Sequence, residues 1–394
     1  DGRVRPVRGI LPALLAARAA GLGRAVVPAG QTGEAQLVTG LTVWGVRDLA
    51  DLVEVLHGRP VLTGAGPRSV PAPLAVPDLA DVLGQEQARW ALEVAAAGGH
   101  HIFFHGPPGT GKTMLAQRLP GLLPLLDDEQ ALEVSAVHSL AGEDLGGGLI
   151  RRAPFADPHH NATVAAMVGG GARVARPGAV SLAHRGVLFL DEAPEFSAGV
   201  LDCLRQPLES GVVTIDRVGG RASYPAAFQL VLAANPCPCG KAGGRGLECT
   251  CTSLQRRRYF SRLSGPLLDR VDIQVEVGAV SAADLVSTGH GESSVEVARR
   301  VLRARRAAER RLAGTPWRLN AEVPGSYLRG PDGGLSAPLS RRLMTALERG
   351  DLSLRGVDRV LRLAWTLADL EGVETLALAH IGTALALRTS GVRP

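Results

Sequence analysis

Apolar residues in the middle of the chain form short, continuous runs at residues 102–105, 187–190 and 229–233. Runs of this length are typical of strands that are buried on both faces of a parallel sheet. Residues 85–97 and 111–119 instead have apolar side chains at the spacing of a helix. Because strands that alternate with helices form βαβ units, we expect a three-layer α/β domain.

The pattern changes on either side of this domain. From about residue 293 onward the spacing is helical, and we predict helices at residues 295–312, 338–349, 355–370 and 374–388. Near the N-terminus, short apolar strands accompany one predicted helix at residues 11–20. Residues 61–77 are rich in Pro and Gly, which is typical of a linker.

These changes divide the chain. We expect a partial N-terminal domain at residues 1–60, a linker at 61–77, the α/β core at 78–282 and a helical domain at 283–394. Because the chain opens at Asp1 in what has the pattern of mid-domain sequence, we also expect it to be a fragment of a longer protein.

Composition narrows the class of protein. Of the 394 residues, 45% are hydrophobic and 21% are charged, which excludes wholesale disorder. The chain has neither an apolar run long enough to span a membrane nor a signal-peptide pattern, so we expect a soluble, cytoplasmic protein with no membrane partner. The net charge of +5 is weak support for nucleic-acid binding. Its cations are almost all arginine, since Lys112 and Lys241 are the only lysines, and a GC-rich genome produces the same bias.

A glycine-rich segment follows the first predicted strand. Its residues are Gly106, Pro107, Pro108, Gly109, Thr110, Gly111, Lys112 and Thr113, which match the pattern GxxxxGK followed by Ser or Thr. Backbone N–H groups of such a turn bind phosphate, and the helix that follows adds a favourable dipole. We expect Lys112 to reach the β- and γ-phosphates of a nucleotide, and the Thr113 hydroxyl to bind Mg²⁺.

Two other predicted strands lead into polar residues. Asp191 and Glu192 follow one strand, and Asn235 follows the other. Because ligands bind at the carboxyl ends of parallel strands, we expect Asp191 to help bind Mg²⁺ and Glu192 to deprotonate an attacking water. Asn235 is placed to hydrogen-bond that water or the γ-phosphate. Taken singly, the acidic pair is also consistent with a solvated strand end, and Asn235 with a capping residue.

Arg270 lies between two acidic residues, Asp269 and Asp272. An arginine that reaches the γ-phosphate of a neighbouring subunit stabilises the transition state, an effect typically worth about 10³–10⁵ in rate. The alternative is a surface ion pair with Asp269 or Asp272, worth about 0–1 kcal/mol.

The order of these segments resembles an AAA+ ATPase. The stretches at residues 154–160, 181–196, 224–240 and 262–277 are similar to the magnesium-chelatase-like subgroup, and within it to the ComM/YifB family of bacterial competence proteins. This resemblance implies an AAA+ three-layer P-loop core with a C-terminal helical lid. It also implies a homo-oligomer, a hexamer, that hydrolyses ATP with Mg²⁺ and acts on single-stranded or branched DNA. The expected activity is branch migration in recombination during natural transformation.

Two other functions remain open. A chelatase-type ATPase would remodel a protein partner that inserts magnesium into a porphyrin. A regulatory switch would bind the nucleotide with negligible turnover.

The resemblance also assigns positions outside the nucleotide site. Residues 143–185 occupy the place of the helix-2 insertion, and residues 209–224 resemble a β-hairpin that would face the channel of a ring. There Arg217 and Arg221 would contact DNA, although an ordinary surface hairpin is the alternative. In the lid, Arg355 matches the second sensor, a γ-phosphate ligand, and Arg362 is the second choice.

The first 17 residues resemble the C-terminal half of an α+β Lon-protease-like domain, of the ribosomal S5 domain 2-like fold. In Lon a catalytic lysine follows a Gly-Leu pair, but Leu11 stands at that position here, and residues 1–60 contain no lysine. A Ser-Lys protease is therefore excluded for this chain, and we expect the fragment to serve packing or assembly.

Four of the five cysteines form two C-x-C pairs that are separated by nine residues. Cys237, Cys239, Cys249 and Cys251 could surround one Zn²⁺ ion. The spacing is tighter than the usual C-x₂-C, and free thiols or an oxidised pair are the alternatives.

Two further groups of residues invite a function. Residues 299–311 contain seven arginines, for which we expect a solvated helix whose arginine stems cover apolar neighbours, with a nucleic-acid contact as the alternative. We expect His159 and His160 to be hydrogen-bonded structural residues rather than metal ligands.

Overall fold

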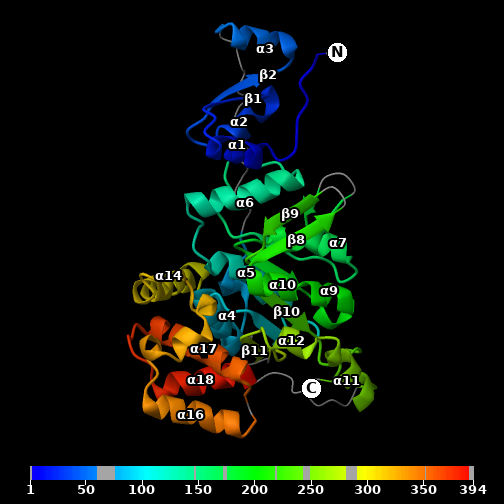
Figure 1. The fold of residues 1–394 in the computed structure, drawn as a ribbon. Coiled ribbons are helices and arrows are strands. Elements are labelled where there is room, and N and C mark those ends of the chain that lie inside the picture. The colour runs from blue at the N-terminus through cyan, green and yellow to red at the C-terminus, as the bar shows by residue number, and fades with distance from the viewer. Residues whose placement is uncertain are drawn as a thin grey trace.

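The computed structural model of this protein describes residues 2–59, 76–145, 148–171, 175–217, 220–242, 249–280, 291–350 and 352–389. Most of the expected linker, the hairpin tip at residues 218–219 and the expected boundary near residue 283 lie outside the described residues. Figure 1 shows an α/β region in the middle of the molecule, between an N-terminal region and a group of C-terminal helices.

A five-stranded parallel sheet forms the centre of the α/β region. Its order is β11 (Ile273–Glu276), β3 (Ile102–His105), β10 (Gln229–Ala234), β7 (Val187–Leu190) and β4 (Phe155–Ala156). Every residue of β3, β7 and β10 is buried, as their apolar runs predicted, and the expected α/β fold class is confirmed. The two edge strands were not predicted, because β4 has only two residues and β11 alternates buried with more exposed positions.

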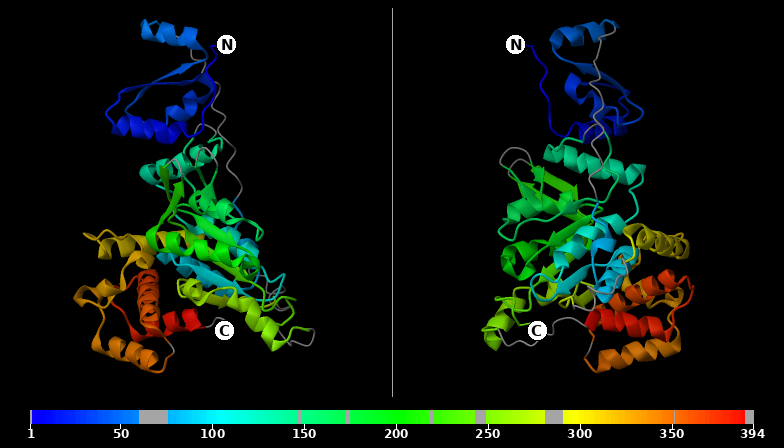
Figure 2. Two further views of the ribbon diagram at one scale, coloured as in Figure 1. Left: turned by 45° about the vertical axis from the view of Figure 1, so that its right-hand side comes forward. Right: turned by 180° about the vertical axis from the view of Figure 1, so that it is seen from behind.

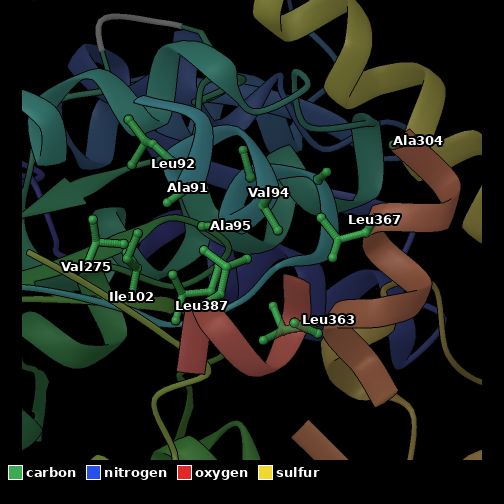
Figure 3. Close-up of a cluster of buried hydrophobic side chains, with 14 of the residues drawn as sticks. Ala91, Leu92, Val94, Ala95, Ile102, Val275, Ala304, Leu363, Leu367 and Leu387 are labelled. Carbon is green, nitrogen blue, oxygen red and sulfur yellow. The ribbon is translucent and has the colours of Figure 1, made fainter. Parts of the chain in front are cut away.

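Helices cover both faces of this sheet. The predicted helices are present as α4 (Glu86–Gly98) and α5 (Lys112–Leu122), and α9 (Ala198–Cys203), α10 (Arg205–Ser210), α11 (Ser253–Ser261) and α12 (Gly265–Leu268) follow later in the chain. Because side chains alternate along a strand, Ile102 and Phe104 enter one apolar cluster, and Phe103 enters the other. Figure 3 shows the first cluster, in which Leu92 of α4 and Leu363 of a C-terminal helix approach the sheet.

The C-terminal helices gather at one end of the molecule, seen from two sides in Figure 2. They are α14 (Ser294–Arg311), α15 (Gly325–Leu328), α16 (Ala337–Glu348), α17 (Leu354–Glu371) and α18 (Leu378–Thr389). The four long helices confirm the predicted ones, although α18 begins four residues later than expected. The backbone N–H of Ala377 donates to the His380 ring at 3.0 Å, so the residues just before α18 form a capping turn.

The arginines of α14 are not all solvated. Arg300 forms an ion pair with Glu93 of α4 at 2.6 Å, and Arg305 donates two hydrogen bonds to the carbonyl oxygen of Ala96. Burial lowers the pKa of Arg305 to about 10. The expectation of a solvated helix was therefore wrong for these two residues, which fasten α14 to the core. Arg299, Arg303, Arg306 and Arg310 are exposed.

A buried polar junction joins the sheet to α17. His100 has Nδ1 at 3.2 Å from Asp272 Oδ2 and Nε2 at 2.7 Å from the hydroxyl of Thr366, and Arg359 donates to Asp272 Oδ1 at 2.9 Å. The side chains of His100 and Asp272 are fully buried. Although burial alone raises the pKa of Asp272, the charge of Arg359 and the hydrogen bond with His100 together hold it below its ordinary value.

The N-terminal region is a small unit that rests on α6 (Asp128–Ala141). It contains α1 (Ile10–Ala19), β1 (Arg24–Pro28), α2 (Thr32–Ala35), β2 (Thr42–Val46) and α3 (Leu49–Leu56), and β1 pairs in parallel with β2. The backbone N–H of Gly9 donates to the carbonyl oxygen of Ser139 in α6. The sequence predicted only one helix here. It missed α3, none of whose eight residues is buried, although Asp48 caps it by accepting from Asp51 N–H.

An insertion with little regular structure lies between α6 and β7, and a hairpin follows α10. The insertion contains α7 (Val164–Val168), α8 (Ala179–Leu182) and the two-residue strands β5 (Gly169–Gly170) and β6 (Arg176–Pro177). The hairpin consists of β8 (Val212–Arg217) and β9 (Gly220–Pro225), which pair antiparallel, as expected for residues 209–224.

Candidate nucleotide-binding site

The carboxyl ends of three neighbouring strands lie at one edge of the sheet. Ala234 of β10 pairs with His105 of β3, and Leu232 of β10 pairs with Leu190 of β7. The segments that follow these strands therefore leave the sheet side by side. They carry the predicted phosphate-binding loop, the Asp-Glu pair and Asn235, which the structure brings together.

Glycines shape the phosphate-binding loop, residues 106–113. Gly109 and Gly111 have φ of 76° and 92°, a conformation that favours glycine, and no atom lies within 4 Å of where a Cβ would stand. At Gly106 a Cβ would stand 2.1 Å from the carbonyl oxygen of Val277. The loop is thus packed tightly against the end of β11 and open towards the start of α5, where a phosphate would meet backbone N–H groups.

The side chain of Gln85 supports the phosphate-binding loop by hydrogen bonds. The sequence analysis did not predict this role of Gln85. Its side-chain amide donates to the carbonyl oxygens of Thr110 at 3.2 Å and Gly278 at 2.6 Å, and its own φ is 55°. The Thr110 hydroxyl in turn donates to the carbonyl oxygen of Pro107 at 2.9 Å. A polar residue at the start of the predicted helix was the only signal, and the partners of Gln85 are distant in sequence.

Lys112 is buried at the centre of the site. Its Nζ donates to the carbonyl oxygens of Gly106 and Pro107, both at 2.7 Å, and to Asn235 Oδ1 at 3.3 Å. Burial lowers the pKa of Lys112, and the charge of Asp191 and its acidic neighbour opposes this effect. The lysine at the start of α5 and the asparagine that follows β10 therefore converge on one point, as the sequence predicted.

The side chains of Thr113 and Asp191, the two predicted metal ligands, lie in contact. The Thr113 hydroxyl donates to Asp191 Oδ2 at 2.7 Å, while Asp191 Oδ1 accepts from the backbone N–H of Glu192 at 2.9 Å. A hydroxyl and a carboxylate are oxygen donors of the kind that Mg²⁺ prefers, so this pair fits the ion. Glu192 itself has φ of 51°, which turns the chain sharply at the end of β7.

His160 lies beside Glu192, with Nδ1 at 3.5 Å from Glu192 Oε2. It also packs against His159, with ring centroids 4.1 Å apart. The expectation of structural residues rather than metal ligands is consistent with these contacts, and the structure in addition places His160 where it can orient the carboxylate of Glu192. The signal that could have found it is the short strand β4, which precedes the two histidines and pairs with β7.

Arg270 pairs with neither of the acids that flank it in sequence. It forms an ion pair with Glu209 of α10 and donates to the carbonyl oxygen of Pro266 at 2.6 Å. The alternative prediction, an ion pair of Arg270 with Asp269 or Asp272, was therefore wrong about the acidic partner. The Glu209 side chain is 62% exposed, whereas that of Arg270 is only 12% exposed, so the acid faces solvent and the arginine is mostly buried.

The two arginines of α17 differ in their surroundings. Arg355 is exposed in the first turn, just beyond Ser353, whose hydroxyl accepts from the backbone N–H of Gly356 at 3.1 Å. Arg362 is half-buried and donates to the carbonyl oxygen of Val323 at 2.7 Å, and this burial lowers its pKa to about 10. Its guanidinium already has a structural partner, which favours Arg355 as the sensor.

Two charged side chains of the hairpin, Arg221 and Asp216, are exposed. Arg221 Nε lies 3.6 Å from Asp216 Oδ1 across the two strands, and the two side chains are 71% and 80% exposed. Arg217 is the last residue of β8, and its side chain lies outside the described part of the chain.

The four predicted zinc ligands come together. Cys237, Cys239, Cys249 and Cys251, called the cysteine cluster below, have Sγ atoms that all lie within 4.8 Å of one another. They are free thiols, as is Cys203.

Comparison with known proteins identifies the family. Residues 78–285 match the family described as magnesium chelatase, subunit ChlI, and residues 291–388 match the family of its C-terminal region. Competence protein ComM of Haemophilus influenzae is 41% identical to this chain over 396 residues, which span 98% of the chain and 75% of ComM. The chain belongs to the ComM/YifB family of magnesium-chelatase-like AAA+ proteins.

Other relatives define the extent of the similarity. The protein Rv2897c of Mycobacterium tuberculosis is 53% identical over 399 residues, which span the whole chain and 78% of that protein. The magnesium-chelatase 38 kDa subunit of Cereibacter sphaeroides is 31% identical over 176 residues, or 39% of this chain and 51% of the subunit. Similarity to the ComM/YifB family therefore runs through the chain, and this member is an ATPase of the ComM type that uses ATP and Mg²⁺. Among its described residues, no helix has the length and apolar character needed to cross a membrane.

Proposed function

We propose that this protein is an ATP-driven motor that assembles into a hexameric ring and promotes branch migration of DNA. The proposal of an ATP-driven motor rests on one observation. Lys112, Asn235 and the Asp-Glu pair lie close together at one edge of the sheet. The DNA substrate is supported by the exposed hairpin and by similarity to a competence protein along nearly the whole chain.

Each residue of the site has a defined task in hydrolysis. The loop amides and Lys112 hold the triphosphate, and Thr113 and Asp191 hold Mg²⁺. The bound ion withdraws charge from the phosphate oxygens. Glu192 takes the proton of the attacking water, and Asn235 orients that water or the γ-phosphate. Arg355, from the first turn of α17, reports on the γ-phosphate to the helical lid.

In a ring, Arg270 would complete the site of the neighbouring subunit. The exposure of its partner Glu209 is compatible with this role, because an exposed acid can release the arginine when a phosphate arrives. Arg270→Ala is expected to lower ATP turnover by about 10³-fold or more while nucleotide binding persists. Mixing Arg270→Ala with Glu192→Gln should restore part of the activity, since some interfaces then combine an intact Glu192 with an intact Arg270.

The control for this experiment is Glu209→Gln, which breaks the ion pair but keeps the arginine. Its turnover should stay near that of the wild type, measured by phosphate release in the same rings. Absence of rescue in mixed rings, or an equal loss in Glu209→Gln, would show that Arg270 acts within its own chain.

The hairpin arginines are expected to contact DNA phosphates. DNA should stimulate ATP turnover, and the double variant Arg217→Ala with Arg221→Ala should lose most of this stimulation while turnover without DNA survives. Two lost phosphate contacts would lower the slope of log affinity against log salt by about 2. The measurement is ATPase rate and DNA binding with forked DNA across a salt series.

A matched control removes two arginines elsewhere, at the exposed positions Arg303 and Arg306 of α14. Arg303→Ala with Arg306→Ala should leave the stimulation intact. If this control loses the response to DNA and the hairpin variant keeps it, α14 is the DNA surface and the hairpin proposal is wrong.

A chelatase-type function is the second candidate, supported by the similarity of part of the chain to a magnesium-chelatase subunit. Its ATPase would respond to a protein partner and a porphyrin rather than to DNA. The same assay with each addition separates the two functions. A nucleotide switch would respond to neither and would hydrolyse little ATP.

A further inference from the structure

The cysteine cluster has the dimensions of a metal site. Cys249 Sγ lies 3.7 Å from both Cys237 Sγ and Cys239 Sγ, and those two are 3.2 Å apart. Four sulfurs at about 2.3 Å from a tetrahedral Zn²⁺ lie about 3.8 Å from one another. A disulfide would require about 2.05 Å between two sulfurs. The observed spacings therefore match a shared ion more closely than a bonded pair.

The burial of the four cysteines differs. Cys237 is buried, Cys239 is exposed, and Cys249 and Cys251 are half-buried. The cluster thus supplies four candidate ligands, all within the described residues.

The cluster also touches the nucleotide site. Cys237 is two residues beyond Asn235. Gly240, which lies between the two C-x-C pairs, has φ of 75°, and a Cβ there would stand 3.1 Å from the side chain of Pro108 in the phosphate-binding loop. The backbone next to Cys239 therefore packs against that loop, and the first C-x-C pair begins three residues beyond the end of β10.

A second connection runs through α11, which begins just after the cluster. Tyr259 of this helix is buried, and the backbone N–H of Asn235 bonds to its hydroxyl. An ion that holds the two C-x-C pairs together would fix both ends of the loop between β10 and α11. It would thereby fix the backbone from which the Asn235 side chain projects.

We propose that the cysteine cluster binds one Zn²⁺ ion, and that the bound ion holds Asn235 and the phosphate-binding loop in position for ATP hydrolysis. Binding displaces the remaining thiol protons to solvent, with no change in oxidation state. Zinc binding by the cluster does not depend on the proposed function. The effect of the ion on ATP hydrolysis does rest on that function.

Metal content of the whole chain, purified with a reductant and without chelators, tests the site. We expect about one zinc per chain in the wild type and in Cys203→Ser, since Cys203 lies outside the cluster. Cys239→Ser and Cys251→Ser should lose most of the zinc while their circular dichroism shows a folded protein. Co²⁺ in place of zinc should give the visible spectrum of a tetrahedral thiolate site. A wild type without stoichiometric zinc, or a variant of the cluster that retains it, would overturn the site.

Removal of the metal tests its effect on the nucleotide site. A zinc-selective chelator, with Mg²⁺ kept in excess, should lower ATP turnover of the wild type at least about tenfold. One equivalent of Zn²⁺, added after the chelator is removed, should restore it, because a displaced Asn235 no longer orients the attacking water. Unchanged turnover after complete zinc removal would overturn the positioning role. A zinc-loaded protein that binds ATP without hydrolysing it would instead overturn the proposed function, and its metal content would still support the site.

Discussion

Glu192→Gln is expected to bind ATP nearly as well as the wild type and to hydrolyse it at least about 10²-fold more slowly. The amide keeps the size and the hydrogen-bonding capacity of the side chain but cannot take a proton from water. In the proposed site, Lys112, the loop amides and the Thr113–Asp191 pair would hold the nucleotide without this carboxylate, so binding should persist. Binding of a fluorescent ATP analogue and phosphate release measure the two quantities separately.

Glu195→Gln is the matched control for this substitution. Glu195 lies three residues further along and pairs with Arg262 at 3.0 Å rather than facing the nucleotide site. Its variant should hydrolyse ATP at close to the wild-type rate. If Glu192→Gln retained most of its turnover, the proton acceptor would have to be another group.

Asp272→Ala is expected to lower the free energy of unfolding by about 3–5 kcal/mol. The substitution leaves Arg359 without its buried partner and removes a hydrogen-bond partner of His100. Urea unfolding followed by circular dichroism measures the change. Asp269→Ala is the control, because Asp269 is half exposed and lies 3.9 Å from Arg388, so its loss should change stability by about 0–1 kcal/mol.

The pH dependence of stability offers a second readout for Asp272. Its folded-state pKa is lowered, so its contribution is present above the unfolded pKa of about 3.9 and is lost as pH falls below that value. The wild type should therefore lose stability on acidification in this range, and Asp272→Ala should lose less. Equal acid sensitivity, or a variant within about 1 kcal/mol of the wild type at neutral pH, would contradict the role of this junction.

Much of the site was predictable because its signals are local. The strands β3, β7 and β10 are buried on both faces, so their sequences are continuous apolar runs that end abruptly in Gly, Asp or Asn. Parallel pairing then places those ends at one edge, whatever the details of the loops. The contact between Lys112 and Asn235 follows from this rule alone.

Other features depend on contacts that the local pattern does not record. His160 reaches Glu192 only because a two-residue strand brings the insertion alongside β7. Arg270 has acids on both sides in sequence, yet its partner Glu209 is 61 residues away. Arg305 lies in an arginine-rich run, which predicts a solvated side chain. The carbonyl oxygen that accepts its hydrogen bond belongs to Ala96 of α4, 209 residues away. In each case tertiary packing decides the partner.

The buried junction has a consequence for how neighbouring sites would communicate. Asp272 is two residues beyond Arg270, and Arg359 is one helical turn beyond Arg355 on α17. The ion pair between Arg359 and Asp272 couples α17, which carries Arg355, to the segment that carries Arg270. If α17 tilted when the γ-phosphate left the site of its own subunit, Arg270 would be displaced as well. Arg270 would then move away from the nucleotide of the neighbouring subunit. Neighbouring nucleotide sites of a ring would then hydrolyse ATP one after another rather than independently.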